Sequence, residues 1–105
     1  MMPRLLIVDD QELLREGIHA LLRRREDIEV VAQASDGAQA VESARLFRPD
    51  IVLMDIDMPR MNGVEATRRI VAEFPDARVI ALTMLADAAA IGDMLAAGAA
   101  GYVVK

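Results

Sequence analysis

The stretch Ile51-Val52-Leu53-Met54-Asp55-Ile56-Asp57-Met58-Pro59 decides the fold of this chain. Its first four residues are apolar without alternation, which is typical of a short strand buried on both faces of a parallel sheet. Asp55 follows where this strand is expected to end, and Met58-Pro59 closes it because proline cannot donate a hydrogen bond to a neighbouring strand. Open α/β sheets bind ligands beyond the carboxyl ends of their strands. The stretch therefore predicts a strand that carries an acid to a binding edge.

The rest of the chain alternates between strand and helix patterns. An apolar run at residues 5–8 is followed by Asp9 and Asp10, which repeats the pattern of the opening stretch. Further strands are expected over residues 28–34, 78–82 and 102–104, with helices over about 11–24, 36–47, 62–74 and 86–100. This alternation predicts an α/β fold: a doubly wound parallel sheet with helices on both faces and right-handed crossovers.

The length of 105 residues predicts a single domain that spans residues 1–105. Five strands are expected but only four helices, so one face of the sheet should lack part of its cover. We therefore expect the last helix to be missing, as in a piece of a longer protein. The core should be aliphatic and rich in alanine, because 54% of the residues are hydrophobic and only 3% are aromatic.

Composition excludes several classes of function for this segment. The absence of cysteine rules out disulfides and thiolate metal sites. No apolar run approaches the roughly 18 residues that a membrane span needs, and no signal-peptide pattern opens the chain, so a cytoplasmic protein without membrane contact is expected. The net charge of −5 argues against direct binding of nucleic acid by this segment.

Polar residues follow the expected strands at one edge of the sheet: Asp9, Asp10, Asp55, Thr83 and Lys105. Three converging carboxylates repel one another unless a cation compensates their charge, and Mg²⁺ prefers such oxygen ligands. A lysine and a threonine hydroxyl can both contact the oxygens of a phosphoryl group. The set therefore predicts Mg²⁺-dependent phosphoryl transfer onto Asp55.

Each of these residues also has an ordinary structural interpretation. Asp9 and Asp10 fit helix capping, and Asp55 fits a turn after a strand. Thr83 alone is an ordinary strand-end threonine. Lys105 is the sole lysine beside eleven arginines, which favours a specific role, although its place at the chain end is also compatible with accident. The joint occurrence of these residues in the right order is what favours a functional site.

Several short motifs together resemble the receiver domains of two-component response regulators: Val8-Asp9-Asp10, Leu53-Met54-Asp55-Ile56-Asp57-Met58-Pro59, Asn62-Gly63, Leu82-Thr83 and Gly101-Tyr102-Val103-Val104-Lys105. The segments 11–17 and 97–102 are most similar to the NarL/FixJ subfamily, whose members usually carry a LuxR-type helix-turn-helix output domain. The resemblance implies a flavodoxin-like (CheY-like) fold with strand order 2-1-3-4-5.

The resemblance also implies a role for each motif residue. Asp55 would accept the phosphoryl group, Asp10 would bind Mg²⁺ directly and Asp9 largely through water. The backbone carbonyl of Asp57 would complete the protein ligands. Lys105 would pair with the phosphoryl group, while Thr83 and Tyr102 would shift on activation; by default, Tyr102 is a half-buried aromatic with a solvated hydroxyl.

The implied partner is a sensor histidine kinase, and a homodimer is possible. DNA would be bound only through an output domain absent from this chain. The domain would catalyse only its own phosphorylation and dephosphorylation, so it would not be an enzyme acting on other substrates.

Three other functions share part of this pattern. Asp55-Ile56-Asp57 resembles the nucleophile motif of haloacid-dehalogenase-like phosphatases, which form an aspartyl phosphate, but Pro59 and the early acid pair depart from that pattern. A flavin-binding protein shares the fold, but its first loop should not be acidic. A phosphorylation-independent interaction module is disfavoured because the whole set of polar residues is present.

Overall fold

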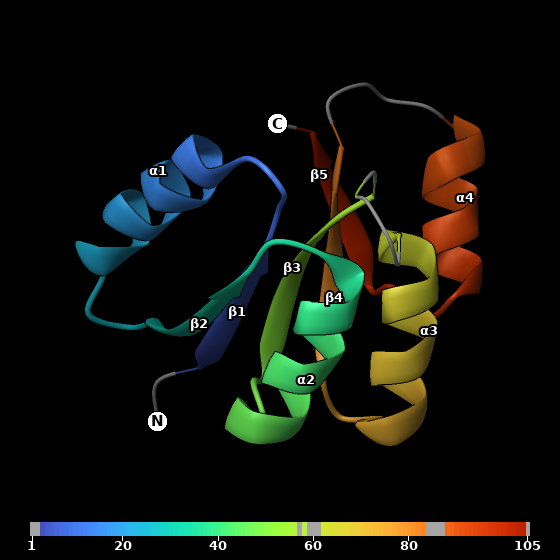
Figure 1. Cartoon of the computed structure of the whole chain (residues 1–105), viewed down its shortest axis with the longest axis horizontal. Coiled ribbons are helices and arrows are strands. Elements are labelled where there is room, and N and C mark those ends of the chain that lie inside the picture. Colours follow the sequence, from blue (N-terminus) through green and yellow to red (C-terminus); the bar gives the residue numbers. More distant parts are fainter. Residues whose placement is uncertain (1–2, 57, 59–61, 84–87, 105) are drawn as a thin grey trace.

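The computed structural model describes residues 3–56, 58, 62–83 and 88–104. Five parallel strands form one sheet in the order β2-β1-β3-β4-β5, which confirms the predicted topology (Figure 1). The elements, in chain order, are β1 (Arg4–Val8), α1 (Glu12–Arg23), β2 (Glu29–Ala34), α2 (Gly37–Phe47), β3 (Ile51–Asp55), α3 (Gly63–Glu73), β4 (Arg78–Thr83), α4 (Ala88–Ala96) and β5 (Gly101–Val104). Among the described residues, no helix combines the length and the apolar character required to cross a lipid bilayer.

The strand register aligns the carboxyl ends of the central strands. Val8 of β1 pairs with Met54 of β3, so the residue that follows each of them lies at the same level. Asp55 pairs in turn with Leu82 of β4, one residue before Thr83. The turns after β1, β3 and β4 therefore start at one edge of the sheet, as parallel pairing requires.

The main core lies on the face of the sheet covered by α2, α3 and α4 (Figure 1). Its largest members have no exposed surface and include Met54 from β3, Ile70 from α3 and Met94 from α4. Alternate residues of β1, β3 and β4 enter this core, which is the period expected for strands packed on both faces. The few large side chains among many alanines agree with the predicted aliphatic core.

The buried face of α3 differs in part from the predicted one. The helical spacing of the sequence predicts that Val64, Thr67, Val71 and Phe74 form the buried stripe of this helix. Thr67 is fully buried, but the other three are only partly buried at the edge of the core. The residues that reach the sheet are instead Gly63, Ala66, Thr67 and Ile70. The buried face of α3 is therefore shifted by about one residue along the sequence relative to the predicted face. The small residues at the start of the helix approach the sheet more closely than a valine allows.

The opposite face of the sheet is covered, among the described residues, by α1 alone (Figure 1). No residue of α1 is fully buried. The helical spacing of Leu14, Ile18, Leu21 and Leu22 predicts that these side chains share the packed face of α1, but Leu21 is 70% exposed. The assignment of Leu21 to the packed face was wrong: α1 packs mainly on β1 and β2, and Leu21 lies on the exposed side of the helix. Val103 of β5 is also half exposed. The predicted lack of cover on one face therefore agrees with the structure.

Asp36 followed three residues later by Gln39 predicts a capping box at the start of α2, and the structure agrees with it. The carboxylate of Asp36 accepts a hydrogen bond of 2.8 Å from the Gln39 backbone N–H, as expected of an N-cap. The Gln39 side chain reaches back to the backbone N–H of Ser35, at 3.0 Å, one residue earlier than the usual partner. This cap fixes α2 directly after β2.

We expect Met94→Ala to lower the free energy of unfolding by about 2–5 kcal/mol, the usual cost of a cavity left by a large core residue. Met94 is fully buried, and its sulfur accepts a 3.8 Å contact from the Thr67 hydroxyl of α3. It is the only fully buried residue of α4, so its loss should release the helix. Urea unfolding measures the change. Leu95→Ala on the same helix, at a side chain that is 46% exposed, is the control and should cost clearly less. Equal losses for the two variants would contradict this packing.

Candidate metal centre

Three carboxylates meet at the carboxyl edge of the sheet. Asp9 and Asp10 follow β1, and Asp55 ends β3. One oxygen from each lies within 4.8 Å of the others. Asp9 and Asp55 are buried, whereas Asp10 is exposed, so the cluster opens to solvent on one side. The structure thus gathers the three acids that the sequence predicted to converge.

The charges of this cluster favour a cation. Two unit charges at 4.8 Å repel by about 3 kcal/mol in an effective dielectric constant of roughly 20, and the cluster holds three such pairs. A hard divalent cation that takes oxygen ligands removes this repulsion, and a site that is partly open leaves room for water or phosphate oxygens. The donor set of three carboxylates therefore fits Mg²⁺ better than a softer metal, which prefers sulfur or imidazole.

Hydrogen bonds fix the turn that carries Asp9. Its backbone N–H donates to the carbonyl of Ala34 in β2 at 3.1 Å. Its carboxylate accepts from the backbone N–H of Gln11 at 2.9 Å, an Asx-type turn just before α1. Gln11 itself is the N-cap of α1 and makes no side-chain capping bond. Capping and metal binding are therefore not exclusive for Asp9, since one of its oxygens closes the turn while the carboxylate faces the cluster.

Arg15 of α1 also reaches this turn, which sequence reasoning missed. Its Nη1 donates to the backbone carbonyl of Asp9 at 2.6 Å. Arg15 belongs to the segment 11–17 that carries the family resemblance, but a bond from a side chain to a main-chain carbonyl leaves no pattern of residue types in a sequence. Its role became visible only with the folded turn.

Gly63, the first residue of α3, packs against the backbone of Asp55. Its N–H donates to the carbonyl of Ile56 at 3.0 Å. A Cβ at this position would collide with the carbonyl oxygen of Asp55 and would lie 3.0 Å from the Cα of Ile56. Only glycine permits this approach. The Asn62-Gly63 pair thus begins the helix, as predicted, and it also supports the backbone of the acid.

The remaining predicted site residues fall into two groups. Thr83 ends β4 and is buried, and the Ile56 N–H bonds to the carbonyl of Leu82 at 3.2 Å, so Thr83 follows directly beside the end of β3. Tyr102 lies on the edge strand β5 with its side chain 51% exposed, which agrees with a half-buried aromatic. Asp57 and Lys105 lie outside the described residues.

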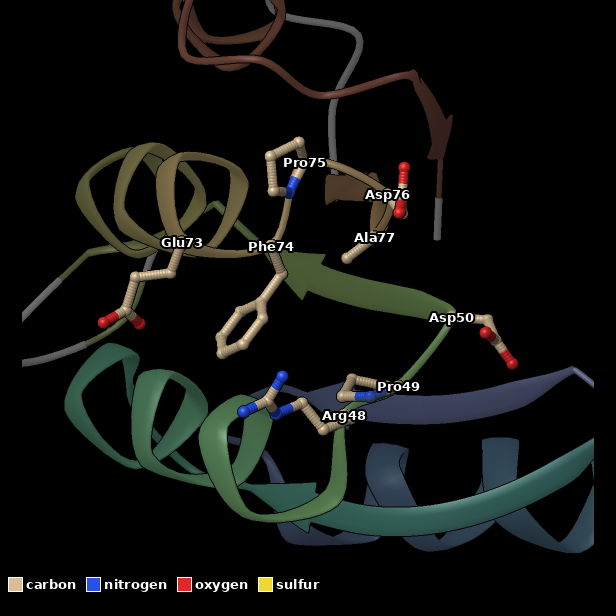
Figure 2. Close-up of a pocket in the computed structure, with 8 residues that line it drawn as sticks. All are labelled: Arg48, Pro49, Asp50, Glu73, Phe74, Pro75, Asp76 and Ala77. Carbon is tan, nitrogen blue, oxygen red and sulfur yellow. The ribbon is translucent and has the colours of Figure 1, made fainter.

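A separate pocket of about 320 Å³ lies at the amino-terminal ends of β3 and β4, where α2 and α3 end (Figure 2). The Arg48 guanidinium lies 5.0 Å from the centre of the Phe74 ring, and Figure 2 shows the two side chains facing each other. Glu73, at the rim, pairs with Arg45 of α2 at 2.9 Å, and this hydrogen bond lowers the pKa of the Glu73 carboxyl. These contacts join α2 to α3 and are remote from the acid cluster.

Comparison with known proteins gives consistent matches. The transcriptional regulatory protein LnrK of Bacillus subtilis is 46% identical over 104 residues, which is 99% of this chain and 47% of LnrK. A two-component response regulator of the LuxR family from Aurantimonas superposes with a TM-score of 0.93 at 40% identity, over 100% of this chain and 75% of that one. A chain of the CheX–CheY–BeF₃–Mg²⁺ complex of Borrelia burgdorferi gives a TM-score of 0.89 at 31% identity, over 97% and 77%.

The family match covers nearly the whole chain. Residues 5–105 match the profile of the response regulator receiver domain. The chain spans about half the length of the curated relatives it matches. The response regulator from Aurantimonas is of the LuxR family, which agrees with the NarL/FixJ resemblance of the sequence. The chain therefore belongs to the receiver domain family of two-component response regulators, within the NarL/FixJ subfamily.

Proposed function

We propose that this receiver domain accepts one phosphoryl group on Asp55, with Mg²⁺ held by Asp9, Asp10 and Asp55. The observation that carries the proposal is the convergence of these three carboxylates within 4.8 Å at the end of the central strands. A relative that is 31% identical was crystallised in a complex described as containing BeF₃ and Mg²⁺, which supports the same chemistry here.

In the proposed reaction a carboxylate oxygen of Asp55 attacks the phosphorus atom of the donor. A new O–P bond forms as the bond from phosphorus to the leaving group breaks, and the leaving group departs with its electron pair. Asp9, Asp10 and Asp55 would hold the cation, which would supply positive charge beside the phosphoryl oxygens and the carboxylates. Burial of Asp55 to 5% exposure limits water around the acyl phosphate, and the exposed Asp10 marks the open side where the donor enters.

The other motif residues take supporting roles in this proposal. The backbone carbonyl of Asp57 completes the cation ligands, and Lys105 pairs with the phosphoryl oxygens. Thr83 is buried beside the end of β3, and its hydroxyl donates a hydrogen bond to an oxygen of the phosphoryl group once Asp55 carries that group. Tyr102, half exposed on β5, then turns inward, and the surface of α4 and β5 shifts between two states.

The whole protein is proposed to be a cytoplasmic transcription regulator. Its relatives are about twice as long as this chain and carry names such as transcriptional regulatory protein. We propose that a histidine kinase is the natural donor. A following helix would cover the open face beside α1, and a helix-turn-helix output domain would bind DNA, with a homodimer as the active form.

The proposal is tested by intact-mass measurement after incubation of the chain with acetyl phosphate, with and without Mg²⁺. We expect the mass of one phosphoryl group to be added per chain, only when Mg²⁺ is present, and then to be lost slowly. EDTA added before the donor should prevent labelling, because the repulsion among the carboxylates returns.

Three outcomes would reject the proposal. Labelling that is unaffected by EDTA would exclude the metal from the reaction. Continuous hydrolysis of a generic phosphate ester over many turnovers would indicate a phosphatase instead. An unchanged mass of the chain at saturating donor and Mg²⁺ would indicate an interaction module that works without phosphorylation.

A further inference from the structure

A hydrogen bond from Arg15 holds the backbone of the turn that carries Asp9 and Asp10. The donor, Nη1, belongs to the first full turn of α1, and the acceptor is the main-chain carbonyl between the two neighbouring acids Asp9 and Asp10. The distance of 2.6 Å is short even for a charged donor. Rotation of this peptide would move Asp10 and the Asp9 side chain together.

Arg15 does not resemble an ordinary surface arginine. A surface arginine extends its head group into water while its stem covers apolar surface. The Nε of Arg15 is instead fully buried, and no acceptor meets it within the part of the chain that the structure describes. Such a buried donor is unfavourable, so the contact of Nη1 with Asp9 has to offset its cost.

Packing alone does not fix α1 against the turn. None of the residues of α1 is fully buried, and the helix packs mainly against β1 and β2. Among the described residues, two hydrogen bonds join side chains of α1 to other segments: Arg15 to Asp9, and His19 to Gln33 of β2 at 2.8 Å. Only the first of these touches the acid cluster.

We propose that Arg15 is a positioning residue for the divalent cation. By holding the Asp9 carbonyl, it fixes the peptide that presents Asp9 and Asp10, and so raises the affinity of the acid cluster for Mg²⁺. The inference rests on the proposed function only in taking Mg²⁺ as the occupant. Residues that orient metal ligands commonly change metal affinity by about 10–100-fold when they are replaced.

The charge of Arg15 alone predicts the opposite change in Mg²⁺ affinity when the guanidinium is removed. A guanidinium beside the site repels a divalent cation, so its removal would tighten Mg²⁺ binding if electrostatics dominated. Positioning predicts that its removal weakens binding. The direction of the change therefore separates the two roles.

Isothermal titration of the full chain with Mg²⁺, at fixed ionic strength, tests the proposal. Arg15→Met keeps the length of the stem but removes the donor, and we expect its Kd to rise about tenfold. Arg15→Gln, whose amide ends two bonds short of Nη1, should show the same rise and serves if the methionine variant does not fold. Arg15→Lys keeps a donor and should recover most of the affinity. Arg23→Met, at the far end of α1, removes the same charge and should leave the Kd unchanged.

A second readout separates positioning from a general loss of structure. Labelling by acetyl phosphate should need about tenfold more Mg²⁺ for half its maximal rate in Arg15→Met, while the rate at saturating Mg²⁺ stays that of the wild type. A lower saturating rate with unchanged Mg²⁺ dependence would overturn the proposal. So would an equal or tighter Kd in Arg15→Met and Arg15→Gln. A wild-type chain that binds Mg²⁺ but is never labelled would reject the proposed function. The titration of the Arg15 variants with Mg²⁺ would then decide the role of Arg15 by itself.

Discussion

Replacing Asp55 by asparagine is expected to abolish phosphoryl incorporation from acetyl phosphate. The amide oxygen of asparagine is a poor nucleophile and cannot form a stable acyl phosphate, whereas the shape of the side chain is nearly unchanged. Asp55 is buried at the end of β3, and the other two acids of the cluster, Asp9 and Asp10, are assigned to the cation. Intact mass after incubation with donor and Mg²⁺ measures the loss directly.

The control for this variant is Asp76→Asn. Asp76 is an exposed acid in the turn before β4, at the edge of the sheet opposite the cluster (Figure 2). Its replacement removes one carboxylate as well, and it should leave labelling at the wild-type level. Labelling that persists in Asp55→Asn and disappears in Asp76→Asn would reassign the acceptor. Circular dichroism of both variants checks that the fold is retained.

Gly63→Ala is expected to destabilise the domain and to slow labelling by at least about tenfold. The added methyl group meets the carbonyl oxygen of Asp55 and the Cα of Ile56, which are backbone atoms and cannot rotate away. Overpacking of this kind costs about 1–3 kcal/mol, and more where backbone must move. Any shift of α3 that relieves the collision also displaces the backbone of Asp55. Urea unfolding measures the first effect and the labelling rate measures the second.

Gly17→Ala is the matched control, because the same change there should have the opposite sign. Gly17 lies within α1, and a Cβ built on it meets nothing within 4 Å. Alanine favours a helix interior by about 0.5–1 kcal/mol over glycine, so the free energy of unfolding should rise slightly. If Gly63→Ala were as harmless as Gly17→Ala, the close contact between α3 and Asp55 would not exist.

The order of elements and the convergence of the acids could be predicted because both depend on local patterns. Runs such as residues 51–54 identify buried strands, and parallel pairing then brings their carboxyl ends to one edge. Asp9, Asp10 and Asp55 follow from that rule without any knowledge of side-chain packing. The capping box at Asp36 was equally local, since its partners lie within four residues.

Features that depend on contacts between distant segments could not be predicted. The face of α3 is set by how closely Gly63 and Ala66 approach the sheet, and hydrophobic periodicity does not distinguish Ile70 from Val71. Leu21 repeats at helical spacing but is 70% exposed, and the spacing alone does not show which neighbouring segment covers it. The bond from Arg15 to the Asp9 carbonyl has a main-chain acceptor, and every residue offers one.

The most direct test of the central claim is an anomalous difference map from crystals of this chain soaked in Mn²⁺, a cation that takes the same oxygen ligands as Mg²⁺. We predict a single strong peak within coordinating distance of carboxylate oxygens from Asp10 and Asp55, on the side where Asp9 faces the cluster. A peak elsewhere on the surface, or none between these three acids at saturating Mn²⁺, would contradict it.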